Sequence, residues 1–402
     1  MEKRTTTKAA LAIMGVFFLQ PFAIGGWLAL IPQVKADLGL SKAELSIALM
    51  GLPVALLIAL QIAGRVVGKF GPRRTIKVFF PLQGAVTVLP LLATGVPSLF
   101  AALFVLGCMM AFLEVGMNVY AGRLEKQKDV MIMNRCHAFW AVGLMAGSAL
   151  VTFAPGLVPL EMLAGLAIVS AVFGLLAGYL LPGLEREHTT VTLPRRQIGE
   201  LPKTLVFVAL FMLVVTLTEG VMADWSAVYL AEKLNDPYGN AGIAVTVFSG
   251  FLAGGRFLGD WLKRRIGAVA LARVTVCSAV LGLVVLVLPS PVWLALPGFA
   301  LMGFGVSAAY PLGVSAAASL GDDHEAQNIA IASTVALGGF LIGPPLIGFV
   351  SEASSLPMAF ACLVPGLVLG LGLTRWLGAG TESDSASSAT QIAAGRRNLP
   401  LD

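Results

Sequence analysis

Residues 45–74 of the chain read LSIALMGLPVALLIALQIAGRVVGKFGPRR. The first part of this stretch, residues 45–64, carries no charged side chain, and about 20 such residues are what an α-helix needs to cross the hydrocarbon core of a bilayer. A basic run that ends in Arg73 and Arg74 follows at once. The stretch therefore predicts a membrane-spanning helix that ends at a positively charged loop.

The same arrangement returns later in the chain, where residues 243–265 read IAVTVFSGFLAGGRFLGDWLKRR. Both stretches contain the pattern G-R-x-x-G, at Gly64–Gly68 and again 191 residues on at Gly255–Gly259. In each case the pattern closes an apolar span and leads into a basic run. Such matched positions indicate a duplicated unit, as in many membrane carriers.

The composition extends this interpretation to the whole chain. Of the 402 residues, 57% are hydrophobic and only 12% are charged, which excludes an ordinary soluble protein. Twelve apolar spans are predicted, at 9–31, 44–67, 76–94, 98–120, 136–153, 161–181, 203–229, 241–258, 268–288, 292–317, 328–350 and 358–377. We therefore expect an all-α membrane protein of twelve transmembrane helices in two six-helix, pseudo-symmetric halves.

The longest break between spans defines the domain organisation. We expect an N-terminal half at 1–181, a cytoplasmic linker at 182–202, a C-terminal half at 203–377 and a disordered cytoplasmic tail at 378–402. Of the 27 Lys and Arg residues, all except Lys35, Lys42 and Lys233 fall in the loops and ends on one side of this topology. The positive-inside rule therefore places both termini in the cytoplasm, in a multi-pass protein of the bacterial inner membrane.

Several other classes of protein are disfavoured. The net charge of +5 follows the predicted cytoplasmic loops, so it does not indicate nucleic-acid binding. The four cysteines lack metal spacing, and the chain has no phosphate-binding loop and no H-E-x-x-H or G-x-S-x-G motif. We expect no cofactor, no metal site and no enzyme activity.

The loop at 64–74 resembles the basic inner-loop signature of the major facilitator superfamily, G-x-x-x-D-R-x-G-R-R. Gly68 stands here in place of the acidic residue, whereas in the second half Asp260 follows Gly259. The resemblance implies a carrier of two six-helix halves that works by alternating access. The missing acid in the first half puts the usual charge latch of that loop in doubt.

Four further segments are similar to the fucose-permease-like branch of the superfamily, which includes the uncharacterised inner membrane proteins of the YbjJ type. They are EVGMN at 114–118, NRCHAFWAVG at 134–143, EGVMADW at 219–225 and GPPLIG at 343–348. Gln20 is the polar residue of the first span, where fucose permease carries an acid, so fucose is a poor candidate substrate. The fifth span also lacks the G-P-x-x-G-G signature of drug antiporters.

Glu114 is the first candidate for proton coupling, because an ionised carboxylate inside the membrane is costly and a proton neutralises it. Asn118 lies one helical turn further on, and Gly107 and Ala111 precede Glu114 on the same face. The alternative is a structural Glu114 that pairs with Arg135 and joins two helices.

Span 203–229 contains two acids, Glu219 and Asp224. Their spacing of five residues does not place both on one face of a regular helix. Either the helix unwinds near Gly220 or only one acid faces the cavity. We favour Glu219 in the cavity and Asp224 with Trp225 at the outer gate; alternatively Asp224 lies at the water interface and Trp225 is an aromatic anchor.

The remaining candidates are His137, a proton relay or an interface residue, and Gln20, which could bind solute or another helix. Arg65, Arg256, Asp260 and Arg135 are expected to act in gating, although Arg65 and Arg256 could instead reach the cytoplasmic surface.

Together these features predict a monomeric secondary active transporter of a small polar solute, sugar- or polyol-like, that is coupled to protons. An efflux carrier for a small organic molecule and a non-transporting sensor remain alternatives.

Overall fold

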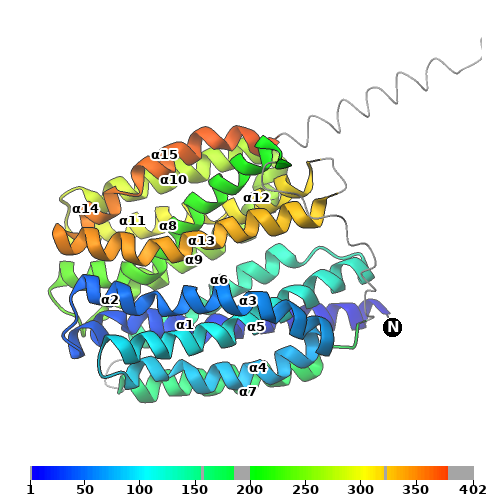
Figure 1. The fold of residues 1–402 in the computed structure, drawn as a ribbon, viewed down its shortest axis with the longest axis horizontal. Helices are drawn as coiled ribbons and strands as arrows, with labels where there is room; N and C mark the ends of the chain where they lie inside the picture. The colour runs from blue at the N-terminus through cyan, green and yellow to red at the C-terminus, as the bar shows by residue number, and fades with distance from the viewer. Residues whose placement is uncertain (1, 155–157, 185–199, 321–323, 379–402) are drawn as a thin grey trace, which may run out of the picture.

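A computed structural model describes residues 2–154, 158–184, 200–320 and 324–378 (Figure 1). These ranges contain helices and turns but no β-strand. Within them, twelve helical segments are long and apolar enough to cross a membrane, and each overlaps one of the twelve predicted spans. The predicted all-α membrane fold is therefore confirmed.

The first half contains α1 (Glu2–Asp37), α2 (Lys42–Leu49), α3 (Gly51–Phe70), α4 (Pro72–Thr87), η1 (Leu89–Leu92), α5 (Val96–Lys128), α6 (Met133–Phe153) and α7 (Pro159–Leu180). The second half contains α8 (Lys203–Leu234), η3 (Asn240–Gly242), α9 (Ile243–Ile266), α10 (Ala268–Val287), α11 (Val292–Val306), α12 (Ala309–Ala318), α13 (Glu325–Ala353), α14 (Leu356–Ala361), α15 (Val364–Leu373) and η4 (Thr374–Gly378). Three spans each contain two consecutive α-helices, namely α2 with α3, α11 with α12, and α14 with α15. Residues 185–199 of the predicted linker and 379–402 of the predicted tail lie outside the described residues.

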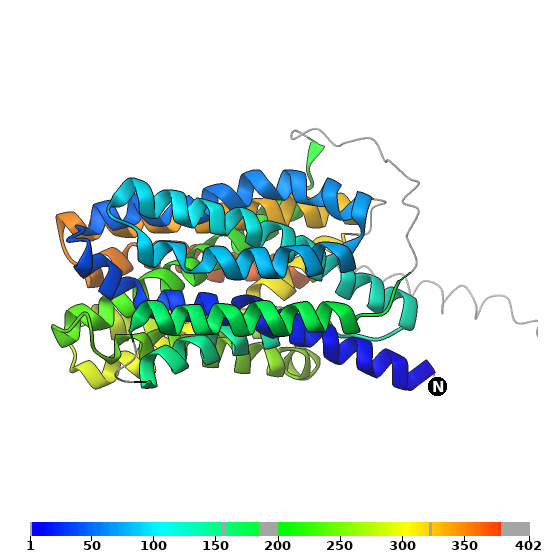
Figure 2. The ribbon, with the colours of Figure 1, turned by 90° about the horizontal axis from the view of Figure 1, so that it is seen from below.

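Figure 1 shows the helices from α1 to α7 in one bundle and those from α8 onward in a second bundle beside it. Figure 2, turned by 90°, shows the helices of both bundles running roughly along one axis. The start of α1 lies at one end of this axis, together with the basic turns at residues 69–74 and 263–267. We call this the basic end, and the other the opposite end.

Small residues allow the central helices to approach closely. Gly143 and Gly147 of α6 lie directly against the backbone carbonyl groups of Phe18 and Phe22 in α1, where a Cβ atom would collide. In lipid, where no hydrophobic force draws apolar helices together, such close backbone packing is a main source of helix association. The α1–α6 contact thus forms the centre of the first half, next to the seam between the halves.

Candidate functional site

A largely buried ion pair joins two helices of the second half. Nη2 of Arg256 in α9 is 2.9 Å from Oε1 of Glu219 in α8, and the two side chains are only 9% and 14% exposed. A charge-assisted hydrogen bond of this kind satisfies two charges that would each be costly alone in a membrane interior. Arg256 thus pairs with an acid on a neighbouring helix, which was one of its two predicted roles, and its side chain is not free to extend to the membrane surface.

Arg256 also reaches the first half. Its Nη1 donates a 3.3 Å hydrogen bond to the backbone carbonyl of His137 in α6. Its guanidinium carbon lies 5.9 Å from the centre of the Trp140 ring, one helical turn further along α6. A cation at this distance from an indole face is attracted by the ring quadrupole. One side chain therefore holds a carboxylate of its own half and two groups of the other half.

Trp140 is in turn held by Gln20, which is itself bonded to a second glutamine. Its indole Nε1–H donates to Oε1 of Gln20 in α1 at 2.8 Å. Gln20 is fully buried and is also bonded to Gln83 in α4, through Nε2 to Oε1 at 3.3 Å. The structure therefore uses the Gln20 side chain to contact other helices, which was one of the two predicted roles for it.

Glu114 in α5 belongs to the same site. Its Oε1 accepts a 3.0 Å hydrogen bond from Nδ2 of Asn118, so these two predicted residues do meet. Glu114 lies within electrostatic range of Arg256, and the hydroxyl group of Tyr310 lies within electrostatic range of both Glu114 and Glu219. Two carboxylates, one guanidinium and one phenol, drawn from both halves, therefore share one region. The predicted alternative, Glu114 paired with Arg135, is not found, since Arg135 is exposed and Asn118 is the partner of Glu114.

Tyr310 was missed by the sequence analysis. It lies at the start of α12, just after the break between α11 and α12, and its hydroxyl donates to Oγ of Ser333 in α13 at 3.1 Å. The available signal was the one tyrosine of the predicted span 292–317, which carries no charged residue. A helix break in a carrier places polar groups next to a cavity.

Of the two alternatives for the seventh span, unwinding near Gly220 is not found. Helix α8 runs without interruption from Lys203 to Leu234, and Gly220 packs against the ring of Phe340 in α13. The two acids of this continuous helix have different surroundings, because Glu219 pairs with Arg256 while Asp224 forms no hydrogen bond or salt bridge within the described ranges. Trp225 is fully buried, so it is not an aromatic anchor at the membrane surface.

The remaining gating candidates separate into two groups. Asp260 in α9 accepts a hydrogen bond from Asn134 in α6 and so joins the halves near the basic end. Arg65 and Arg135 are exposed, and the described part of the chain offers neither a salt-bridge partner.

At the opposite end the halves are sealed by several polar contacts. They are the Lys42–Glu232 ion pair at 3.2 Å, the bond from the Tyr238 hydroxyl to Asp37 at 2.8 Å, the Ser148–Thr246 bond at 2.9 Å, and the bonds from the Lys42 and Ala43 amides to Glu352. Gly348 of α13 lies directly against Ser46 of α2 in the same region. The structure is thus closed at the opposite end.

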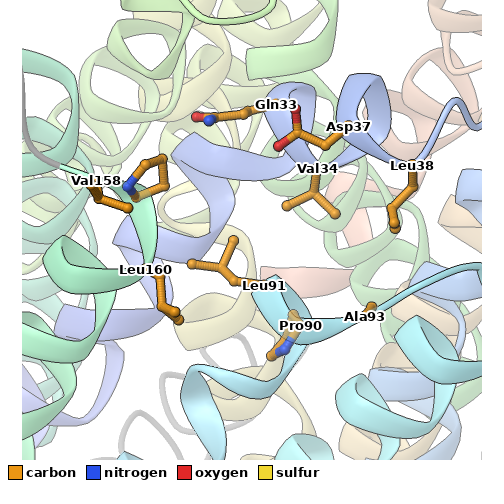
Figure 3. A pocket seen from close by; sticks show the side chains of 10 residues that line it. Gln33, Val34, Asp37, Leu38, Pro90, Leu91, Ala93, Val158 and Leu160 are labelled. Atoms are coloured by element: carbon orange, nitrogen blue, oxygen red, sulfur yellow. The ribbon is translucent and has the colours of Figure 1, made fainter.

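The pocket in Figure 3, with a volume of about 200 Å³, is separate from the site described above. It lies between the end of α1, the η1 turn and the start of α7, and its lining is apolar except for Gln33 and Asp37. In the described ranges no group of three His, Cys, Asp or Glu residues could hold a metal ion.

Comparison with known proteins agrees with this arrangement. Residues 13–320 match the family model described as Major Facilitator Superfamily. The chain belongs to the major facilitator superfamily. It is thus a multi-pass membrane protein of a family of transporters, not of enzymes, and its fold is that of the fucose-permease-like branch.

Similar proteins cover nearly the full chain. An uncharacterized transporter of Sinorhizobium fredii is 31% identical over 86% of this chain and 91% of its own length. An uncharacterized MFS-type transporter of Yersinia pestis is 32% identical over 86% of this chain and 90% of its own. The membrane protein MosC of Rhizobium meliloti is 29% identical over 88% of this chain and 86% of its own.

Two solved structures share the fold. A mutant form of the nucleoside transporter NupG gives a TM-score of 0.75 at 13% identity, covering 92% of this chain and 99% of that one. The transporter FucP in its outward conformation gives a TM-score of 0.66 at 15% identity, covering 93% and 99%.

Proposed function

We propose that this member of the superfamily is a proton-coupled secondary transporter of a small polar solute, sugar- or polyol-like. The observation that carries the proposal is that Glu114 of the first half lies within electrostatic range of Arg256, which is paired with Glu219 of the second half beside the seam between the halves. Alternating access moves the halves about a midplane site, so groups on both sides of the seam change their neighbours in each cycle.

The charges of this site give a route to coupling. Arg256 supplies one positive charge, while Glu114 and Glu219 supply two negative charges when both are ionised. Uncompensated charge is costly in the membrane interior, and a proton bound by Glu114 removes the excess. An ionised Glu114 competes with Glu219 for Arg256, whereas a protonated Glu114 leaves the Arg256–Glu219 bond undisturbed. Proton binding thus biases which arrangement of the halves is favoured.

The polar groups near the carboxylates suit a hydroxylated solute. Asn118, Tyr310 and Ser333 offer amide and hydroxyl groups that can donate or accept hydrogen bonds. The solved proteins with this fold are named as a nucleoside transporter and a fucose:proton symporter, and both names refer to solutes rich in hydroxyl groups. These points favour a sugar- or polyol-like solute over an apolar one.

The positive-inside rule supports a bacterial inner membrane protein with both termini and the basic end in the cytoplasm. In this orientation the sealed opposite end faces outward. We propose a monomer, whose partners are the solute, protons and the lipid bilayer, with no role for nucleic acid.

Transport into proteoliposomes tests the proposal. Labelled nucleosides, hexoses and cyclic polyols are presented with an imposed pH gradient, and at least one is expected to accumulate until a protonophore removes the gradient. Glu114→Gln imitates the protonated side chain, so it should retain solute exchange and lose accumulation. Glu161→Gln, at the exposed start of α7, is the matched control and should transport like the parent. If Glu114→Gln still concentrates solute like the parent, Glu114 is structural and Glu219 becomes the leading coupling residue.

A further inference from the structure

A series of polar contacts runs from α4 of the first half to the central ion pair. It begins at Gln83 in α4, which is 3% exposed, and continues through Gln20 and Trp140 to Arg256. Gln83 contacts none of the charged groups of the site through the bonds that it forms. Its effect on the site must therefore pass through Gln20.

Each hydrogen bond in this series of contacts fixes the orientation of the next side chain. The backbone carbonyl of Gln20 can only accept, and it receives a 2.8 Å bond from Nε2 of Gln83. That bond orients the Gln83 amide, so its Oε1 is available for Nε2 of Gln20 at 3.3 Å. The Gln20 amide is thereby oriented as well, and its Oε1 faces the indole N–H of Trp140, which can only donate.

The orientation of Trp140 matters because Arg256 contacts α6 at two points. The Trp140 ring and the carbonyl of His137 lie on the same face of α6, one turn apart, and both contact the guanidinium group. These contacts hold Arg256 from the side of the first half while Glu219 holds it from the second. A turned indole ring would remove one of the three supports of Arg256.

We propose that Gln83 is a positioning residue for the central ion pair: by fixing the amide of Gln20 it holds the Trp140 ring against Arg256, and so keeps Arg256 on Glu219. The proposal deepens the function proposed above, since it concerns the same site. It assigns a role to a residue of α4 that touches neither of the carboxylates.

Fluorine NMR of protein labelled with 5-fluorotryptophan tests this directly in lipid nanodiscs. The chain has six tryptophans, and Trp140→Phe identifies the signal of Trp140. Arg256→Gln should shift this signal, because it removes the cation beside the ring. Gln83→Met keeps the length of the side chain but removes both hydrogen bonds, and it should shift the Trp140 signal while the other five stay in place.

Two comparisons separate positioning from a general loss of structure. Gln20→Met should shift the Trp140 signal, and adding Gln83→Met should cause no further shift, because Gln83 acts through Gln20. Thr87→Val removes a hydroxyl that bonds only to the backbone carbonyl of Gln83, and it should leave the signal unchanged. If Gln83→Met does not fold, Gln83→Asn, too short to reach both groups of Gln20, replaces it.

An unmoved Trp140 signal in the folded Gln83 variant overturns the proposal, as does a shift that adds to that of Gln20→Met. The measurement needs no solute and no transport. A failure of the proton-coupled transport test is therefore distinguishable from a failure of this positioning role.

Discussion

The carboxylate of Glu352, at the end of α13, accepts hydrogen bonds from the backbone amides of Lys42 and Ala43, at the start of α2, at 2.8 and 3.4 Å. Within α2 itself, Ser41 and Glu44 satisfy each other's amides in a capping box. The first-turn amides of a helix have no partner inside the helix. The second half of the molecule therefore completes the N-terminal cap of a helix in the first half.

Loss of this cap should weaken the seal at the opposite end. Glu352→Gln removes the charge that the helix N-terminus favours, at a cost of about 1 kcal/mol, or roughly fivefold in the population of the sealed state. Ser46→Cys, introduced next to Gly348, should then react faster with a membrane-impermeant maleimide added from outside the cell. Glu44→Gln changes the cap inside one half only, so labelling in that control should stay near the parent rate. Equal labelling in Glu352→Gln and the parent would show that Glu352 does not hold the seal.

Arg256 and Glu219 should stabilise the fold only when both are present. Removing one partner leaves a buried charge without compensation, so Arg256→Gln and Glu219→Gln should each lower the free energy of unfolding by about 3 kcal/mol. The double variant should recover part of this loss. Thermal unfolding in detergent measures the stability of the parent, the two single variants and the double variant. Arg65→Gln, at an exposed position, is the control. Additive losses would exclude a coupled pair.

Arg256→Ala should also loosen the basic end, because it removes the contacts to His137 and Trp140 across the halves. Cysteines placed on α9 between Arg256 and Asp260 should then label faster from the cytoplasmic side. If their labelling is unchanged, Arg256 stabilises its own half and does not act as a gate.

Reporter fusions test the orientation. Fusions after Glu187 and after Asp402 should report the cytoplasm, and a fusion after Lys233 should report the outside, because nearly all Lys and Arg residues lie on one side. An outside signal at Glu187 would contradict the arrangement of six spans on each side of the linker.

The sequence predicts the spans well because the bilayer imposes one length and one composition on every crossing segment. Glu114, Glu219 and Arg256 could be identified as candidate site residues for a related reason. A charged side chain inside a membrane span is costly, so it usually serves a function. Their mutual arrangement could not be found. Contacts between residues on different helices, such as Gln83 with Gln20, depend on how each helix is rotated and crossed, and hydropathy does not report this.

The continuity of α8 illustrates the same limit. A five-residue spacing of Glu219 and Asp224 allowed either a broken helix or two different faces, and the structure decides for an unbroken helix from Lys203 to Leu234. Tyr310 was overlooked because a tyrosine in a membrane span is usual at the interfaces, whereas this one is hydrogen-bonded to Ser333 and lies within electrostatic range of the two carboxylates.

Tyr310 should therefore contribute to solute binding more than to folding. Its hydroxyl bonds to Ser333 across the α12–α13 contact and lies near both Glu114 and Glu219, so a bound solute can replace Ser333 as its partner. Tyr310→Phe removes one neutral hydrogen-bonding group, a loss of about 1 kcal/mol, which is roughly a fivefold rise in KM. Thermal unfolding should change little, because Ser333 is partly exposed and water can satisfy it. The matched control is Tyr120→Phe, whose hydroxyl bonds to the Pro182 carbonyl away from the site and should affect stability but not KM. Uptake at varied solute concentration, measured for both variants, tests whether Tyr310 binds solute. A KM change in Tyr120→Phe but not in Tyr310→Phe would remove Tyr310 from the site.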